Sequence, residues 1–232
     1  MVEAPQALDP RRASRKEKSG ARDQLLAAAS AAMSERDTID VSLQEIAQRA
    51  GLNAGLVRYY FGGKEGLLMA LARRDAEAVL RRLDALMASD MSPLEKLARH
   101  VRGAVDTFFV YPYLDRLLAA LMRDADSRSA REIAEFFTRP ILEAERRILA
   151  DGLACGQMRA VEPMLFYFLA VGTASHLFAG RAELCWAFGV EGIDEALRRR
   201  YSDFVVDILL RGIRAEPDCS GPGTSSNQGN PS

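Results

Sequence analysis

Apolar residues recur at steps of three and four along most of the chain, which is the spacing of a helix with one buried face. The first such stretch runs from Ser19 to about Arg36. Its apolar stripe consists of Leu25, Leu26, Ala29, Ala32 and Met33. Because these side chains fall on one side of a helix, we expect a single amphipathic helix over these residues.

Two short helices joined by a tight turn are expected next. Ser42 and Glu45 have the spacing of a capping box, in which the hydroxyl accepts a hydrogen bond from a first-turn N–H and the carboxylate reaches back. Gly51 supplies the left-handed residue that ends this helix, and Asn53 caps the following one. Helix-turn-helix units of this kind place their second helix in the major groove of DNA.

The rest of the chain predicts a larger helical body. A long helix from Lys64 to about Ser89 leads into it, and proline at the first position opens the next helix. Further helices are expected near residues 94–109, 113–124, 129–151, 163–179 and 193–213. Pro140 should kink the third of these unless two helices meet there. Because no strand-like alternation bounded by hairpin turns is present, we expect an all-α fold.

These patterns divide the chain into segments. We expect a flexible basic N-terminal arm (residues 1–18), a helix-turn-helix DNA-binding domain (19–66), a helical ligand-binding and dimerisation domain (67–214) and a disordered tail (215–232). The whole chain has a net charge of −1, but between Arg11 and Arg22 it carries six basic residues and one acidic residue. A nucleic-acid surface must therefore come from local asymmetry of charge.

Cysteine usage and apolar content exclude several classes of protein. The three cysteines stand at irregular spacings, and with only two histidines they form neither a zinc motif nor a disulfide framework. The most apolar run, residues 164–178, is broken by polar residues and is shorter than the ~20 residues of a membrane span. No secretion signal is expected at the front. These features predict a cytoplasmic protein with no cofactor, no metal and no membrane partner.

The outward side of the third helix carries the candidate DNA-binding residues. With Val57 and Phe61 on the buried side, a rotation of ~100° per residue points Tyr59 away from the core. Gly55 lets the backbone approach DNA closely, and Arg58 can donate two hydrogen bonds to guanine. The full expected set is Ser42, Asn53, Ala54, Gly55, Leu56, Arg58, Tyr59, Tyr60 and Lys64. The alternatives are that the tyrosines pack in the core and that Arg58 is a solvated charge.

Residues 46–67, with the sequence IAQRAGLNAGLVRYYFGGKEGL, resemble the signature of TetR-family transcriptional regulators. The resemblance covers about residues 20 to 70. It implies an all-α homodimer that binds a double-stranded DNA operator and is most often a repressor released by a small-molecule effector. It places Ser42 and Tyr60 at phosphates, and it places Asn53, Ala54, Gly55, Arg58 and Tyr59 in the groove. Because Arg58, Leu56 and Tyr60 replace the family's common tyrosine, threonine and histidine, we expect a changed operator sequence.

Aromatic residues concentrate after residue 100 and suggest a ligand pocket in the body. The candidate lining residues are Phe108, Phe109, Tyr111, Tyr113, Met122, Phe137, Phe166, Tyr167 and His176. Plain core packing is the alternative for each of them. Because no arginine or lysine interrupts residues 164–178, we expect a largely apolar or aromatic ligand.

The last two expected helices, residues 163–179 and 193–213, resemble the pair that forms a four-helix dimer interface in this family. The candidate interface residues are Gly172, Ser175, Phe204, Val205, Ile208 and Leu209. Packing inside their own monomer is the alternative. In a homodimer the two recognition helices should lie about 34 Å apart, one turn of DNA, on a roughly palindromic operator.

Other functions fit the sequence less well than a regulator does. An enzyme needs positioned acids, bases, nucleophiles or metals, and the chain has two histidines far apart, no Gly-rich phosphate loop and no Gly-x-Ser-x-Gly motif. A sequence-tolerant architectural DNA binder would need a basic surface, which a pI near 6.2 argues against. An activator with the same fold remains an alternative to a repressor.

Overall fold

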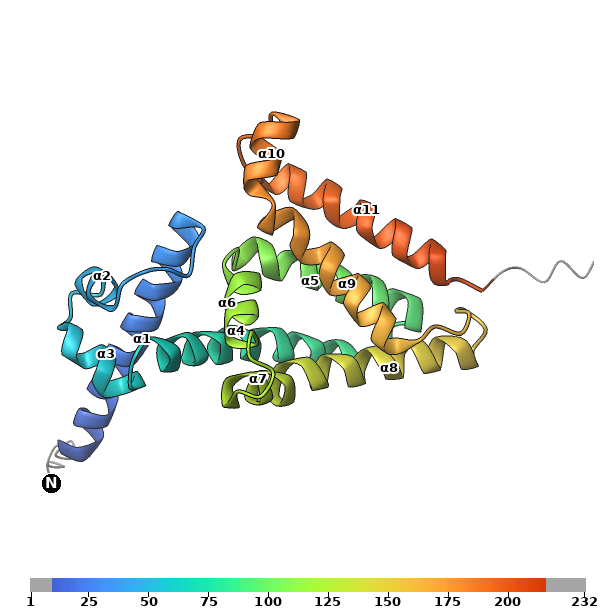
Figure 1. Ribbon diagram of the computed structural model, residues 1–232. Helices are drawn as coiled ribbons and strands as arrows, with labels where there is room; N and C mark the ends of the chain where they lie inside the picture. The colour runs from blue at the N-terminus through green and yellow to red at the C-terminus, as the bar shows by residue number, and fades with distance from the viewer. Residues whose placement is uncertain (1–9, 216–232) are drawn as a thin grey trace, which may run out of the picture.

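The computed structural model describes residues 10–215, and within this range the protein is all-α (Figure 1). The elements in chain order are α1 (Pro10–Arg36), α2 (Leu43–Arg49), α3 (Ala54–Phe61), α4 (Lys64–Met87), α5 (Pro93–Val110), α6 (Leu114–Leu121), α7 (Arg128–Ile133), the π-helical turn η1 (Ala134–Thr138), α8 (Arg139–Ala154), α9 (Pro163–Ala179), α10 (Arg181–Phe188) and α11 (Glu195–Ile213). Residues 10–215 contain no strand, in agreement with the predicted fold class.

Helices α1, α2 and α3 form a small domain at one end of the molecule, here called the head (Figure 1). α1 begins at Pro10 rather than at Ser19, so part of the expected flexible arm is helical. This segment consists mainly of Arg, Lys, Glu, Ser and Ala, and once a neighbouring segment is packed such residues extend a helix without any apolar stripe of their own. The rest of the arm, residues 1–9, and residues 216–232 of the expected tail lie outside the described residues.

The remaining helices form the body, and α4 runs from the head into it (Figure 1). α5 is the central helix, since it packs against α4, α8, α9 and α11. It begins with a complete capping box, because Glu95 N–H donates to the Ser92 hydroxyl and Ser92 N–H donates to Glu95 Oε2 at 2.9 Å. The expected helices at residues 94–109, 113–124, 163–179 and 193–213 correspond to α5, α6, α9 and α11.

The expected helix over residues 129–151 is interrupted, and the irregularity lies next to Pro140. Proline has no N–H to donate to the preceding turn. The chain widens directly before it into η1, where Arg139 N–H donates to the carbonyl of Ala134, five residues earlier. α7 and α8 are therefore joined by one wide turn, so the prediction of a disturbed helix at this proline is confirmed.

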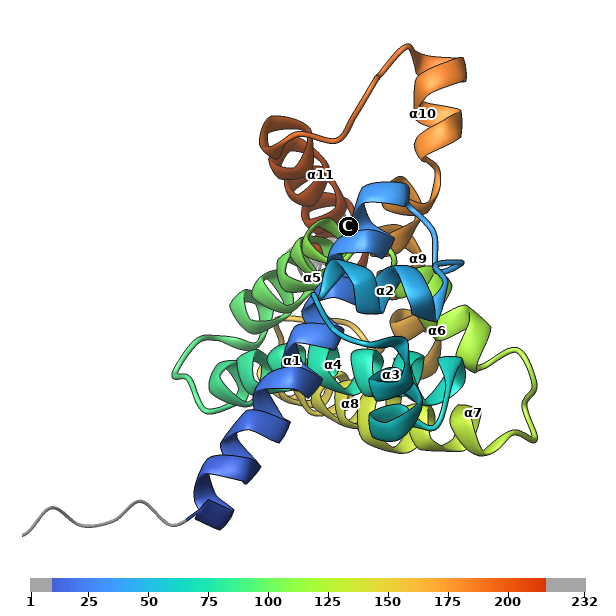
Figure 2. The ribbon, with the colours of Figure 1, turned by 90° about the vertical axis from the view of Figure 1, so that its left-hand side faces the viewer.

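α10 was not expected from the sequence. None of its residues is buried, and Trp186 and Phe188 have exposed fractions of 88% and 69%. A helix that packs so little on its own chain shows no apolar stripe that a periodicity search could detect. Figure 2 shows α10 standing apart from α11 at the end of α9. No single described helix is long and apolar enough to cross a membrane; α9 and α10 reach that length and composition only together, with a 64° bend between them.

The largest hydrophobic core does not stop at the boundary between head and body. Leu25 and Val57 of the head belong to the same cluster as Val105, Leu117 and Phe178 of the body. A second cluster lies among α5, α8, α9 and α11, and a smaller third one lies around α4 and α8. Because packed cores are close to rigid, a shift in the body around the first cluster is felt by the head.

Candidate DNA-binding site and its junction with the body

The third helix presents the face that the sequence predicted. Val57 is fully buried, whereas Tyr59 has an exposed fraction of 67%. Asn53 caps the helix, since its Oδ1 accepts a hydrogen bond from Gly55 N–H at 2.7 Å. Gly62 ends the helix in the left-handed conformation with φ of 74°. Local capping at both ends and one buried valine therefore fix the rotation of α3.

Within the predicted set, most side chains on α3 reach solvent. Asn53, Ala54, Gly55, Arg58 and Tyr59 are exposed, while Leu56 and Tyr60 are half-buried and pack against the head core. The rings of Tyr59 and Tyr60 meet edge to face at 5.1 Å between centroids. Tyr60 is therefore held between core and solvent.

Ser42 caps α2, but the predicted capping box is only half formed. The Ser42 hydroxyl accepts a hydrogen bond from Glu45 N–H at 3.1 Å. The Glu45 carboxylate does not return to Ser42; it accepts a hydrogen bond from Arg36 Nη1 at 3.0 Å instead. A nearby guanidinium is a stronger partner for a carboxylate than a neutral N–H, which explains the exchange. This ion pair ties the end of α1 to α2.

Lys64 has a partner that the sequence did not suggest. Its Nζ lies 2.7 Å from Asp40 Oδ1, in the connector between α1 and α2. The hydrogen bond from Lys64, and then its charge, lower the pKa of Asp40. Both side chains are substantially exposed, so the pair is weak and can open. Any phosphate contact by Lys64 competes with Asp40.

Two further contacts hold the head together. Arg49 of α2 donates to both carboxylate oxygens of Glu35 in α1, one of them at 2.7 Å. The Arg22 guanidinium of α1 lies over the Phe61 ring of α3, 5.4 Å from its centroid. A two-point carboxylate pair and a cation–π contact both depend on direction, so they set the position of α2 and α3 on α1.

A buried polar cluster joins the head to the body. The fully buried Tyr113 donates from its hydroxyl to Asp75 Oδ2 at 2.7 Å and lies 2.8 Å from the Ser30 hydroxyl of α1. Arg74 completes the cluster, since its Nε donates to Asp75 Oδ1 at 2.8 Å. Burial raises the pKa of Asp75, while the hydrogen bond from Tyr113 and the charge of Arg74 oppose the rise. Tyr113 was expected to line a pocket; the structure places it at this junction.

A second polar link meets the end of α1. Arg116 of α6 donates to the carbonyl of Asp37 at 2.6 Å and also binds its carboxylate. The same guanidinium donates to the carbonyl of Ala179, the last residue of α9, at 3.3 Å. Asp37 has a positive φ of 51°, which is costly for a residue other than glycine and which Arg116 helps to hold. Nothing in the sequence pattern distinguishes Arg116 from a solvated arginine.

The residues expected to line a ligand pocket are spread over the three hydrophobic clusters. Phe108, Phe109, Tyr111 and Tyr113 belong to or pack against the first cluster, Phe166 belongs to the second, and Phe137 and Tyr167 pack against the third. Met122 and His176 are exposed. None of these residues lines the hollow of about 400 Å³ beside α7 or the hollow of about 410 Å³ between α4 and α8.

The residues expected at a dimer interface divide between two faces. Ser175, Val205 and Leu209 are buried in their own chain. Phe204 and Ile208 have exposed fractions of 64% and 54%, and Gly172 is also exposed. On α9, Leu165, Phe168 and Leu169 are exposed as well. The two helices therefore keep an apolar face in solvent, here called the α9–α11 face.

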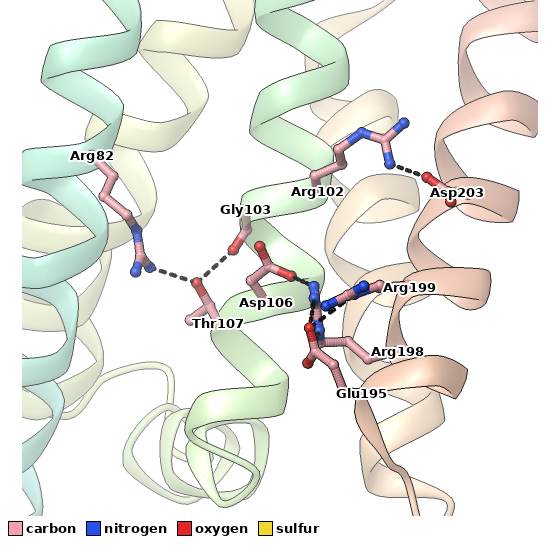
Figure 3. Close-up of polar contacts among 9 residues, drawn as sticks. All are labelled: Arg82, Arg102, Gly103, Asp106, Thr107, Glu195, Arg198, Arg199 and Asp203. Atoms are coloured by element: carbon pink, nitrogen blue, oxygen red, sulfur yellow. Dashed lines mark hydrogen bonds and ion pairs between the residues drawn. The ribbon is translucent and has the colours of Figure 1, made fainter.

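Ion pairs fasten α11 to the central helix, as Figure 3 shows. Arg198 binds Asp106 of α5, and Arg102 of α5 binds Asp203. Glu195, in the first turn of α11, accepts hydrogen bonds from Arg198 and Arg199 (Figure 3). The hydrogen bond from Arg198 is the main reason that the pKa of Glu195 falls to about 2. On the other side of α5, Arg82 of α4 donates to the Thr107 hydroxyl at 2.9 Å.

A head that exposes a capped recognition helix, joined to a helical body through a continuous core, defines a DNA-binding regulator. Residues 25–71 match the model of bacterial regulatory proteins of the tetR family, and residues 90–218 match the tetracyclin repressor-like C-terminal domain. The chain belongs to the TetR family of transcriptional regulators, as the resemblance of its helix-turn-helix predicted.

Relatives and solved structures agree with this assignment. The chain is 35% identical over 154 residues to the HTH-type transcriptional regulator BetI of Serratia proteamaculans, covering 57% of this chain and 75% of BetI. It is 24% identical over 174 residues to RutR of Escherichia coli, covering 74% and 80%. The fold is similar to FadR from Bacillus subtilis in complex with stearoyl-CoA, with a TM-score of 0.64, 20% identity and coverage of 82% and 98%. These proteins are transcriptional regulators, which confirms the prediction that the chain is not an enzyme.

Proposed function

We propose that this protein is a repressor that binds a roughly palindromic operator as a homodimer and is released by a small-molecule effector. The observation that carries the proposal is the orientation of α3, in which Val57 is buried and Tyr59 is exposed. The side chains that would recognise the operator sequence therefore lie on the side of α3 that can enter a major groove.

Each exposed residue of the head has a distinct role in this proposal. Arg58 donates two hydrogen bonds to O6 and N7 of a guanine. Tyr59 and Tyr60 donate hydroxyls to phosphates, and Ser42 contacts a phosphate at the start of α2. Asn53 keeps its Oδ1 for Gly55 N–H, which leaves its amide group to donate to the DNA.

The α9–α11 face supports the homodimer. Its exposed apolar side chains are Leu165, Phe168 and Leu169 on α9 and Phe204 and Ile208 on α11. α9 is apolar on nearly all sides, and such a helix is stable in water only when both of its sides are covered. A second copy of the chain covers it by two-fold symmetry, and the two heads then contact successive turns of one duplex.

The junction supports control by an effector. FadR, the structural neighbour named above, is described in complex with stearoyl-CoA, so the fold can hold a small molecule. In the present chain the first core cluster, the Tyr113 cluster and Arg116 connect the body to α1. An effector that binds one arrangement of the body better than the other shifts the spacing of the heads and lowers operator affinity.

The test is binding of the purified protein to its own upstream DNA and to random DNA of equal length at ~100 mM salt. We expect a clear preference for the upstream fragment and a steep fall of affinity as salt rises. Arg58→Ala should weaken binding to the preferred site by about 1 to 3 kcal/mol and binding to random DNA much less. No preference for the upstream DNA would refute the proposal, and equal losses on both DNAs would make Arg58 a phosphate contact.

A further inference from the structure

A carboxylate without a full set of partners is buried in the body. Glu145 of α8 is fully buried. Its Oε1 accepts a hydrogen bond from Nε2 of His100 in α5 at 2.9 Å. Its Oε2 is also buried, but it has no hydrogen-bond partner among the described residues. Native proteins rarely leave a buried carboxylate oxygen unpaired, because removing it from water carries a large free-energy cost.

Side chains of α9 and of α8 itself lie around Glu145. Tyr167 of α9 is close enough for the Glu145 charge to add to the rise in its phenol pKa, most of which comes from burial. The side chains one helical turn away on α8, Ile141 and Ile148, are both buried. No arginine or lysine of the described range forms an ion pair with Glu145, whose side-chain partner is the His100 imidazole.

A hollow lies beside the third hydrophobic cluster. It measures about 410 Å³, lies between α4 and α8, and has Leu83 and Ala144 in its lining. Both of these residues belong to the third cluster, against which Tyr167 packs. Glu145 follows Ala144 directly on α8 but does not itself line the hollow, whose lining also includes Asp84, Glu143 and Arg147. Apolar side chains such as those of Leu83 and Ala144 can separate to admit a molecule without breaking a hydrogen bond.

We propose that Glu145 Oε2 is the anchor for the effector, and that the effector is a small organic cation with an N–H donor on an apolar or aromatic frame. The proposal rests on the proposed function, because it identifies the chemical class of the molecule that acts on the body. A protonated amine gives Oε2 the partner that it lacks and neutralises a buried charge. A carboxylate ligand would be repelled by Glu145, and a neutral hydroxyl gives a hydrogen bond without neutralising the charge.

The experiment uses three probes of similar shape on the full chain: 2-phenylethylamine, 2-phenylethanol and 3-phenylpropanoate, each at pH 7.5. Calorimetric titration should show the amine binding at least 10-fold more tightly than the alcohol, with no binding of the carboxylate. Glu145→Gln keeps the size of the side chain and an acceptor for His100, and it should weaken amine binding at least 10-fold. The matched control is Glu135→Gln in η1, where the carboxylate is exposed, pairs with Arg139 and does not line the hollow; it should leave amine binding unchanged.

Three outcomes would overturn the proposal: no amine binding, equal binding of amine and alcohol, or undiminished binding to Glu145→Gln. The comparison of probes on the wild-type chain decides the question even if that variant does not fold. Operator binding without any probe is measured on the same samples. Intact operator binding with no selectivity for the amine refutes the anchor alone, whereas selective amine binding without operator preference refutes the repressor function alone.

Discussion

The head and the body of this protein are stabilised by interactions of different range along the chain. In the head, Ser42 and Asn53 cap helices within three residues of themselves. In the body, the decisive contacts join distant residues, such as Asp75 with Tyr113 and His100 with Glu145. A surface built from local rules can be derived from a short stretch of sequence. A sensor built from distant contacts depends on how whole helices pack, so its residues can be recognised only in the fold.

The strongest way to break this comparison is to separate the two copies of the chain in the proposed homodimer. Phe204→Asp combined with Ile208→Asp places two charges on the α9–α11 face, where both side chains are exposed in the single chain. We expect monomers in sedimentation analysis, and operator affinity lower by about 100-fold or more because the second head no longer benefits from the first. If the monomer bound the operator as tightly as the wild type, the head would be sufficient without the body.

The control for this prediction is Met91→Asp, which also charges an exposed apolar residue, with an exposed fraction of 38%, but in the loop between α4 and α5 rather than on α9 or α11. It lies just before the N-terminus of α5, where a negative charge is well tolerated. We expect it to remain dimeric, and circular dichroism should show that all variants keep their helical content. A wild-type chain that sediments as a monomer would contradict the predicted interface.

The sequence predicted the head well because short-range rules decide it. The helical period placed Val57 inside and Tyr59 outside, and the structure agrees. The sequence pattern did not predict the ion pair of Glu45 with Arg36 or that of Lys64 with Asp40. Arg36 lies on a different helix from Glu45, and Asp40 lies in the connector between α1 and α2. The distance between the two charged groups of each pair therefore depends on packing. Local rules thus give the direction of a backbone, while the partner of a long charged side chain depends on the tertiary structure.

The next prediction tests the junction between the two regions. Tyr113→Phe removes a fully buried hydroxyl and leaves Asp75 Oδ2 without its donor. We expect the free energy of unfolding to fall by about 1 to 3 kcal/mol, measured by urea denaturation, because a buried charged acceptor loses its partner. Ser30→Ala is the milder comparison, since it removes one hydrogen bond to the same hydroxyl. If Tyr113→Phe were as stable as the wild type, the Tyr113 hydroxyl would not contribute to the stability of this junction.

The body was predicted only in outline. Helical periodicity gave α5, α6, α9 and α11, since each packs an apolar side on its own chain. It missed α10, which has no such side. The aromatic residues after residue 100 did not converge on one site but were divided between three clusters. An aromatic side chain packs equally well in a core and in a pocket, so residue type alone does not separate the two.

A smaller effect is expected at the edge of the head. Asp40→Asn removes the charge that holds Lys64, which is then free to meet a phosphate. We expect binding to all DNA sequences to become tighter by a few-fold, with a slope of log affinity against log salt that is steeper by up to about 1. Lys64→Ala should have the opposite effect on both quantities. An unchanged salt slope in both variants would show that Lys64 does not contact DNA.

The smallest expected effect concerns the first turn of α11, where Glu195 pairs with Arg198 and Arg199 of the same helix. Arg198 and Arg199 lower the pKa of Glu195 to about 2, against an ordinary value of 4.5. A carboxylate whose pKa is lower in the folded chain adds stability above its unfolded pKa and loses it as pH falls towards the folded value. The midpoint of urea unfolding should therefore be lower for Glu195→Gln than for the wild type at pH 7, and the difference should shrink between pH 4.5 and pH 2. Because Glu195 is exposed, 1 M salt should reduce the difference as well. Glu191→Gln, just outside α11, should show no such difference; if both variants behaved alike, general surface charge rather than the pairing of Glu195 with Arg198 would account for the effect on stability.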